Sequence, residues 1–231
     1  MRTLIFDGNF MAHRARHATG RLRNGIAYGM IQSMFKTCQH FNTNKMIWVF
    51  DAGRSQARMD MHDAYKTNRG EIDGLLSSQV SWVETAIRSL GAAWIKHPGT
   101  EADDVIAVLA RKEIEGPVTI VSSDKDFLQL VDDRITVWNP ISKKEETFET
   151  MRDSLDGMIP KYRYLDVKSL IGDPSDSIDG IKGFGWKTAI KACKMFDSFD
   201  CLPIDGLTGR MSVINEPESI EKLKRNHALM S

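Results

Sequence analysis

Short apolar runs bounded by polar residues recur along the chain. They are RTLIFDG at 2–8, KMIWVFDAG at 45–53 and PVTIVSSDKD at 117–126. Apolar runs of this length that do not alternate with polar residues are typical of parallel strands covered on both faces. We therefore expect each run to form a buried strand of a parallel sheet.

Helical spacing follows these runs. The apolar residues Leu76, Val80, Val83, Ile87 and Leu90 follow one another in steps of four, three, four and three. The next residue is Gly91. This spacing predicts an amphipathic helix with a glycine stop. The segment 101–112 repeats the pattern with Val105, Ile106 and Leu109. Strands alternating with helices predict an α/β fold with a mostly parallel central sheet flanked by helices.

Two stretches depart from this alternation. Residues 53–74 carry many charges and few large apolar side chains, so we expect an exposed excursion from the sheet. After about residue 150 the pattern changes to helices and glycine-rich turns. The predicted organisation is an α/β core over 1–150, including the excursion at about 53–75, and a helical region over 151–231.

Composition narrows the class of protein. A chain of 231 residues with 42% hydrophobic content can build a sizeable core. Its cysteines, Cys38, Cys193 and Cys201, are odd in number and form no CxxC pair, which favours neither disulfides nor zinc. No apolar run approaches the roughly 20 residues of a membrane span, and the N-terminus resembles a strand more than a signal peptide. We expect a soluble, unsecreted intracellular protein.

Each predicted strand ends in aspartate. Asp7 follows LIF, Asp51 follows WVF, and Asp124 and Asp126 follow TIVSS. Ligands bind outside the carboxyl ends of strands in open parallel sheets, so these side chains should converge on one edge. A lone aspartate there would be an ordinary turn or cap residue, but several strands ending alike indicate a site.

Further carboxylates crowd the start of the helix in GTEADDVIAVLARK, at Glu101, Asp103 and Asp104. Acidic residues suit a helix N-terminus, and Thr100 is expected to cap it, so one interpretation is purely structural. Capping does not explain why other acids gather opposite. The alternative is that this helix forms one wall of the same carboxylate cluster.

Such a cluster needs cations. Two carboxylates about 4 Å apart repel by roughly 4 kcal/mol at an effective dielectric of 20. Oxygen ligands without nearby histidine or cysteine favour hard ions, so we expect Mg²⁺ or Mn²⁺. Two such ions about 3.5–4 Å apart can activate water and stabilise the leaving oxygen in phosphodiester hydrolysis.

A second acidic motif is LIGDPSDSIDGIKGFGWKTA. Asp173 and Asp176 precede three glycines, Gly180, Gly183 and Gly185. A P-loop does not fit, because Trp186 separates the last glycine from Lys-Thr and no strand precedes it. A plain glycine-rich turn stays open. The other interpretation is a helix-hairpin-helix, whose amides approach a phosphate backbone, with lysines adding charge at Lys182, Lys187, Lys191 and Lys194.

These motifs together resemble a known family. FDG, VFDA, YKTNR, EADDVIA, SSDKDFLQLV and GDPSDSIDGIKGFGWKTA occur in the order found in the 5′-nuclease or flap endonuclease family, over residues 4 to about 197. That family includes the 5′ to 3′ exonuclease domain of bacterial DNA polymerase I and stand-alone bacteriophage enzymes. The resemblance implies a PIN-like fold with a helical arch and a C-terminal helix-hairpin-helix, or helix-three-turn-helix, at about 173–197.

The resemblance also assigns roles. It implies a metal-dependent phosphodiesterase that cuts 5′ flaps, nicks and free 5′ ends of DNA. The first metal's implied ligands are Asp7, Asp51, Glu101 and Asp103. The second metal's are Asp124, Asp126, Asp173 and Asp176. Asp104 matches an acidic position whose contact with metal stays open, and a K⁺ ion at the glycine turn is compatible with the resemblance.

Basic residues are assigned to DNA. The YKTNR stretch resembles the foot of the helical arch, where Lys66 and Arg69 would face the scissile phosphate and Tyr65 would stack on a base. The remaining predicted contacts are Arg54 and Arg58 of the arch, Arg14, Arg16 and Arg21 of the 13–23 run, and Gly180, Lys182, Gly183, Gly185, Lys187 and Lys191 of the hairpin. Basic and acidic residues each number 31, but once the expected metal ligands are set aside, a basic body remains.

We expect a stand-alone monomer that acts in DNA replication or repair and does not bind a membrane. Its expected location is the cytoplasm of a bacterial or bacteriophage-infected cell. Its DNA substrate can be RNA-primed. Rival functions stay open. A PIN-type or RNase H-like ribonuclease would share the strand-end carboxylates but is not expected to carry the SDSIDGIKGFG hairpin. A non-catalytic DNA-binding module would not explain why so many acidic residues are expected at one edge of the sheet.

Overall fold

The computed structural model describes residues 1–53, 60, 74–196, 198–203 and 205–231. Two compact units make up these residues: the first falls within Met1–Ser55 and Gly70–Phe148, and the second includes Glu149–Ser231. The predicted arch at about 53–75 lies almost entirely outside the described residues, as do Arg54, Arg58, Tyr65, Lys66 and Arg69. Within the described part of the chain, no helix is both long and apolar enough to cross a membrane.

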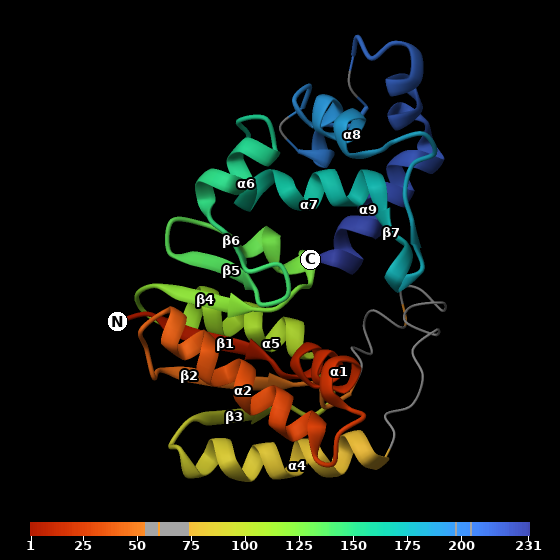
Figure 1. Ribbon diagram of the computed structural model, residues 1–231. Helices are drawn as coiled ribbons and strands as arrows, with labels where there is room; N and C mark the ends of the chain where they lie inside the picture. Colours follow the sequence, from red (N-terminus) through yellow and green to blue (C-terminus); the bar gives the residue numbers. More distant parts are fainter. Residues whose placement is uncertain (54–59, 61–73, 197, 204) are drawn as a thin grey trace. The chain divides into compact units, whose positions relative to one another are not determined.

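The first unit is built on a six-stranded sheet with the order β3-β2-β1-β4-β5-β6 (Figure 1). Its strands are β1 (Thr3–Asp7), β2 (Met46–Phe50), β3 (Ala93–Lys96), β4 (Val118–Val121), β5 (Ile135–Asn139) and β6 (Lys144–Glu146). All neighbours pair in parallel except β5 and β6. The predicted α/β fold with a mostly parallel sheet is thus confirmed. The expected strands form β1, β2 and β4.

Helices cover both faces of this sheet. They are α1 (Gly8–Thr19), α2 (Gly25–His40), α4 (Gly74–Ser89) and α5 (Ala102–Val108), the last continuing as a π-helical turn over Leu109–Glu113. In Figure 1, α2 and α4 lie side by side on one face. Leu4 and Phe6 of β1 belong to the same buried cluster as residues of α2 and α4. Ile5 lies between them in the strand and therefore faces the other side of the sheet, where α5 contacts β1.

Aromatic rings fill the core beneath α2 and α4. The rings of Phe6 and Trp48 stack at 4.6 Å, and those of Phe50 and Trp94 at 4.1 Å. A Cβ at Gly8 would overlap the Phe50 ring, so only glycine lets α1 begin directly after β1. This close packing fixes the direction in which the chain leaves Asp7.

Gln79 of α4 provides the N-terminal cap of α2. The residue before α2, Asn24, makes no capping bond with its side chain. Instead, Gln79, only 2% exposed, accepts hydrogen bonds through Oε1 from Ile26 N at 3.0 Å and Ala27 N at 3.1 Å. The two helices are therefore joined by a buried polar contact at their N-terminal ends.

Gln79→Ala should lower the free energy of unfolding by about 2–3 kcal/mol, because it leaves two amide donors of a helix start without their acceptor. Denaturant unfolding of the purified protein measures this change. The matched control is Gln39→Ala, at an exposed position of α2, which should stay within about 0.5 kcal/mol of the unsubstituted protein. Equal losses in the two variants would contradict the capping role.

The second unit is helical, with a small two-stranded ribbon. Its elements are α6 (Phe148–Ser154, whose first residue belongs to the first unit), α7 (Pro160–Ile171), β7 (Gly172–Asp173), the 3₁₀ turn Pro174–Asp176, β8 (Ile178–Asp179), α8 (Trp186–Cys193), the 3₁₀ turns Phe199–Cys201 and Gly209–Asn215, and α9 (Pro217–Met230). Prolines at the first position of α7 and α9 suit helix starts. Buried Asn226 of α9 donates to Ser169 O and Asp179 O, which joins α9 to α7 and β8.

Candidate metal centre and nucleic-acid interface

Asp7 lies at the end of β1, the strand from which the chain builds the sheet first on one side and then on the other. The chain runs from β1 through β2 to β3 on one side, and β4 then returns to the other side of β1. Ligands of open α/β sheets bind at this switch point, outside the carboxyl ends of the strands. Asp7 closes β1, and Ser122 directly follows β4. The candidate centre is built from this pair of strand ends.

Two hydrogen bonds hold the Asp7 carboxylate. Oδ1 accepts from Phe10 N at 3.0 Å, which caps α1, and Oδ2 accepts from Ser122 Oγ at 2.7 Å. The same Ser122 hydroxyl oxygen accepts from Asp124 N at 3.1 Å. Ser122 was not among the predicted site residues, although the SSDKD run after the strand contained the signal. It orients both strand-end aspartates.

The electrostatics of Asp7 show that other carboxylates are near. Burial raises the pKa of Asp7 to about 6, and the hydrogen bonds from Phe10 and Ser122 act in the opposite direction. The charges of Asp124 and Asp51 also contribute to this increase. The structure therefore brings both Asp51 and Asp124 within electrostatic reach of Asp7.

Asp51 joins the start of α5 to the same edge. Its Oδ1 accepts from Ala102 N, the first residue of α5, at 2.7 Å. The expectation that Thr100 caps this helix is wrong, because the N-cap residue is Glu101 and its side chain makes no capping bond. The Thr100 hydroxyl instead lies 2.8 Å from His97 Nδ1. Since a neighbouring strand end caps α5, its acidic first turn is held beside the sheet edge.

The remaining predicted ligands of the first unit fall on these elements. Glu101 is buried, and Asp103 and Asp104 are half-buried in the first turn of α5. Asp124 caps the 3₁₀ helix Lys125–Leu130 by accepting from Asp126 N at 2.9 Å. All candidate donors are carboxylate oxygens, the chemistry that Mg²⁺ and Mn²⁺ prefer.

In the described part of the first unit, the candidate ligands have the right chemistry for a hard cation, but their side chains are not yet close enough together to hold one. Among the residues that the structure describes, no three Asp, Glu, His or Cys side chains are already arranged to hold one ion. Mutual repulsion keeps carboxylates apart until a cation offsets it. The sheet edge thus supplies the donors, and their inward rotation would have to accompany binding.

Asp173 and Asp176 belong to the second unit. Asp173 ends β7, and its Oδ2 forms an ion pair with Lys168 Nζ at 2.7 Å. Both side chains are 14% exposed. Lys168 was not predicted, and its spacing from Asp173 gave no recognisable signal. Asp176 is buried in the following 3₁₀ turn.

The glycines that follow Asp173 and Asp176 are required for different structural reasons. A Cβ at Gly180 would collide with Ile171 O, so this glycine allows close approach of β8 to α7. Gly183 has a φ of +86°, and Gly185 is the N-cap residue of α8. The turn therefore leads into a helix N-terminus with an open Gly185, which suits an approaching phosphate.

α8 is strongly two-faced. Its buried side holds Ala189, Ile190, Ala192 and Cys193. Lys182 in the turn and Lys187 and Lys191 on the helix are exposed. The predicted hairpin residues thus form one turn-and-helix surface with lysines on its outer side.

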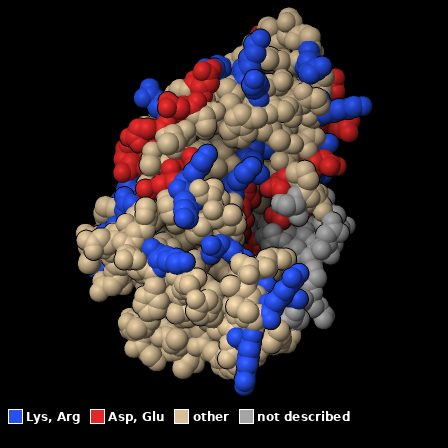
Figure 2. Space-filling view, in the orientation of Figure 1, with Lys and Arg blue, Asp and Glu red and all other residues tan. Residues whose placement is uncertain are grey.

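Basic residues of the first unit line a groove between α1, α2 and the β5–β6 turn. Its volume is about 530 Å³, and Arg14, Lys36 and Lys143 contribute to it. Arg14 is held there by donation from Nη1 to Ser33 Oγ at 2.9 Å. Figure 2 shows Lys and Arg side chains recurring over this unit's visible face. Arg16 and Arg21 are exposed but do not line the groove, and sequence reasoning missed Lys36 and Lys143.

The fold defines an α/β protein with carboxylates at the strand ends beside the switch point of its sheet, and sequence comparison gives the family. The profile of the 5′-3′ exonuclease N-terminal resolvase-like domain matches residues 2–156. The chain belongs to this 5′-3′ exonuclease family, which confirms the resemblance seen in the sequence motifs.

Relatives agree with this assignment. The thermostable DNA polymerase I of Thermus thermophilus is 34% identical over 87% of this chain and 25% of its own length. DNA polymerase I of Bacillus subtilis is 33% identical over 99% of this chain and 27% of its own. The chain thus spans about a quarter of the length of these curated relatives.

Solved structures share the fold. A bacteriophage T5 flap endonuclease in a pseudo-enzyme-product complex with DNA and metal ions aligns with a TM-score of 0.79. The alignment covers 100% of this chain and 89% of the T5 chain at 22% identity. The mostly parallel sheet and its flanking helices therefore have a direct structural counterpart.

Proposed function

We propose that this chain is a structure-specific 5′-nuclease that hydrolyses DNA phosphodiesters with two divalent cations, Mg²⁺ or Mn²⁺. The observation that carries the proposal is the convergence of Asp7, Asp51 and Asp124 at the switch point of the sheet. The ions would activate the attacking water and stabilise the leaving oxygen. The T5 counterpart with DNA and metal ions supports the same conclusion.

The chain's own residues supply binding and orientation. Asp7 is fixed by Phe10 N and Ser122 Oγ, so that its carboxylate cannot turn away from the edge. Asp51 holds the start of α5, and with it Glu101 and Asp103. Asp173 and Asp176 are proposed to complete the set from the second unit. Because Asp7 and the start of α5 are already held in place, the movement on ion binding would fall to the surrounding carboxylates.

DNA is proposed to bind through backbone contacts. The glycine turn and N-terminus of α8 would receive a phosphate, with Lys182, Lys187 and Lys191 adding charge. A K⁺ ion at that turn is part of the proposal. The groove with Arg14, Lys36 and Lys143 would hold duplex DNA, and Lys66, Arg69 and Tyr65 would act at the scissile phosphate.

The proposed substrates are 5′ flaps, nicks and free 5′ ends, including RNA-primed ends. We propose that the protein acts as a monomer during replication or repair inside a bacterial or bacteriophage-infected cell. The DNA polymerase I relatives support this setting. An RNase H-like preference for RNA is the second candidate, because primer removal and flap cutting need the same phosphodiester chemistry.

A cleavage assay on matched flap, nicked, single-stranded and RNA-primed substrates tests the proposal. With Mg²⁺ or Mn²⁺, the unsubstituted protein should cut the flap fastest. Asp124→Asn combined with Asp126→Asn should lower the cleavage rate at least about 100-fold, because it removes two negative charges from a metal site. Lys66→Ala should lower cleavage while flap binding is retained.

Several outcomes would overturn the proposal. A double variant that cuts flaps as fast as the unsubstituted protein would exclude the two-metal assignment. Faster cutting of structured RNA than of flap DNA would point to a ribonuclease. Binding of flap DNA without cleavage when either ion is supplied would indicate a non-catalytic binding module.

A further inference from the structure

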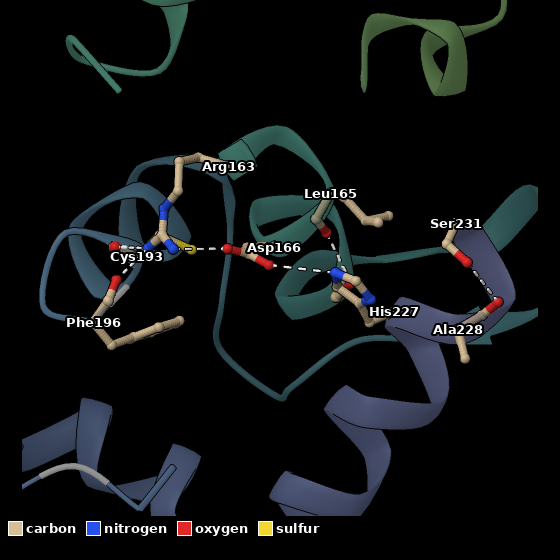
Figure 3. Close-up of polar contacts among 9 residues, drawn as sticks. Arg163, Leu165, Asp166, Cys193, Phe196, His227, Ala228 and Ser231 are labelled. Carbon is tan, nitrogen blue, oxygen red and sulfur yellow. Dashed lines mark hydrogen bonds and ion pairs between the residues drawn. The ribbon is translucent and has the colours of Figure 1, made fainter. Parts of the chain in front are cut away.

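A buried arginine joins three segments of the second unit. Arg163 of α7 is 9% exposed, and its Nη2 donates to the backbone carbonyls of Cys193 and Phe196 (Figure 3). Its guanidinium also lies 5.2 Å from the centre of the Phe196 ring. One side chain therefore binds α7 both to the end of α8 and to the segment that follows it.

The carbonyl groups that Arg163 contacts are those a helix leaves without partners. Cys193 is the last residue of α8, and the final carbonyls of a helix have no intrahelical donor. A buried cation at this end also complements the negative end of the helix dipole. Arg163 thus acts as a C-terminal cap supplied from another helix.

Asp166 orients this cap. Its Oδ2 lies 2.9 Å from Arg163 Nη1, and its Oδ1 lies 3.6 Å from His227 Nε2 of α9. Burial raises the pKa of Asp166 to about 6, although the charge of Arg163 acts in the opposite direction. Asp166 therefore contacts both the guanidinium of Arg163 and the imidazole of His227, which fixes the direction of the guanidinium.

The other end of α8 is held to the same part of the unit. Ile181 N, in the glycine turn, donates to Leu170 O of α7 at 2.8 Å. Trp186, the first residue of α8, lies 6.0 Å from Tyr164 of α7, measured between ring centres. An eight-residue helix is only about 12 Å long, so contacts at both ends determine its tilt.

We propose that Arg163 is a positioning residue for DNA binding, which fixes the tilt of α8 so that the glycine turn and Lys182, Lys187 and Lys191 meet one phosphodiester backbone together. Asp166 keeps the guanidinium aimed at the two carbonyls. The inference rests on the proposed function, because it assumes that this turn and helix contact DNA. Arg163 itself is buried and touches no phosphate.

The test compares binding with chemistry. Arg163→Met removes the donors with little change in length, and Arg163→Lys retains one cation. Equilibrium binding to a 5′-flap duplex in the presence of chelator gives the dissociation constant at several salt concentrations. Single-turnover cleavage at saturating flap DNA with Mg²⁺ gives the rate of chemistry. Arg225→Met, at an exposed position of α9, is the control for loss of one positive charge.

We expect Arg163→Met to weaken binding about tenfold or more and to flatten the salt dependence, because fewer phosphates are contacted at once. The saturated cleavage rate should stay within about twofold. Arg163→Lys should bind with intermediate affinity, because one ammonium cannot hold both carbonyls in the guanidinium's planar geometry. Arg225→Met should match the unsubstituted protein in binding and in chemistry.

Unchanged affinity and salt dependence in folded Arg163→Met would overturn the inference, as would equal losses in binding and saturated rate. If Arg163→Met does not fold, Arg163→Lys decides: affinity equal to that of the unsubstituted protein overturns the inference. Failure of the unsubstituted protein to bind flap DNA would instead overturn the proposed function.

Discussion

Asp7→Asn should abolish flap cleavage, with a loss of at least about 1,000-fold, while the protein stays folded. A metal ion contributes several kcal/mol of transition-state stabilisation, and about 4 kcal/mol corresponds to that factor. Asparagine retains an oxygen for Phe10 N but lacks the charge that would hold the ion. Single-turnover cleavage with Mg²⁺ or Mn²⁺ measures the loss. Asp133→Asn, at an exposed position, is the control and should keep full activity.

The same variant should show an opposite effect on the stability of the metal-free protein. Burial raises the pKa of Asp7 from 3.8 to about 6, so the folded protein binds this proton more tightly than the unfolded chain. Such a group contributes stability below about pH 4 that is lost as the pH rises through about 6. Asparagine does not titrate. The stability of Asp7→Asn relative to the unsubstituted protein should therefore rise by about 2.4 kcal/mol between pH 4 and 7.

Unfolding in chelator across that pH range measures the difference, and melting with added Mn²⁺ provides a second readout. The ion should raise the melting temperature of the unsubstituted protein more than that of Asp7→Asn, because bound ligand stabilises the folded state. Full cleavage by Asp7→Asn would exclude Asp7 as a ligand. A pH-independent stability difference would show that the pKa of Asp7 is not raised in the folded protein.

Gly172→Ala should destabilise the second unit by about 3 kcal/mol or more. Gly172 has a φ of +81°, which strains any residue with a side chain. A Cβ there would also overlap Gly180 N and lie 2.5 Å from Ile178 O. Because Gly172 directly precedes Asp173, the last residue of β7, we expect cleavage to fall together with stability. Denaturant unfolding and the flap assay measure the two effects.

Gly157→Ala separates strain from close contact. Gly157 lies in the same unit with a φ of +88°, but nothing lies within 4 Å of a Cβ built there. This control should lose only the roughly 1–2 kcal/mol of the left-handed backbone conformation. If Gly172→Ala is no less stable than Gly157→Ala, the close approach of β7 and β8 is not what requires glycine.

The strand-end part of the site was predictable because it depends on chain order alone. An unbroken apolar run followed by aspartate predicts a buried parallel strand with an acid at its carboxyl end, and β1, β2 and β4 follow that rule. β3 and β5 were missed. AWIK is short and ends in an exposed lysine. The apolar residues of ITVWN are interrupted by Thr136, and this strand pairs antiparallel with β6.

The supporting contacts were not predictable, because they join residues far apart in the chain. Ser122 meets Asp7 across 115 positions, and Gln79 meets Ile26 across 53. Thr100 was predicted to cap α5 because it precedes the helix, but Asp51 reaches the first amide from a neighbouring strand. The preference of Thr100 for a capping position was therefore outweighed by a contact that depends on how the strands are paired in the sheet.

The ion pair between Lys168 and Asp173 gives the second unit an internal counter-ion. A divalent ion bound at Asp173, as proposed above, would compete with an ammonium 2.7 Å from one of its carboxylate oxygens. Competition with a tethered monovalent cation favours ions of higher charge density. The carboxylate would have a positive partner with or without the ion, and a displaced Lys168 would be available to a phosphate of bound DNA.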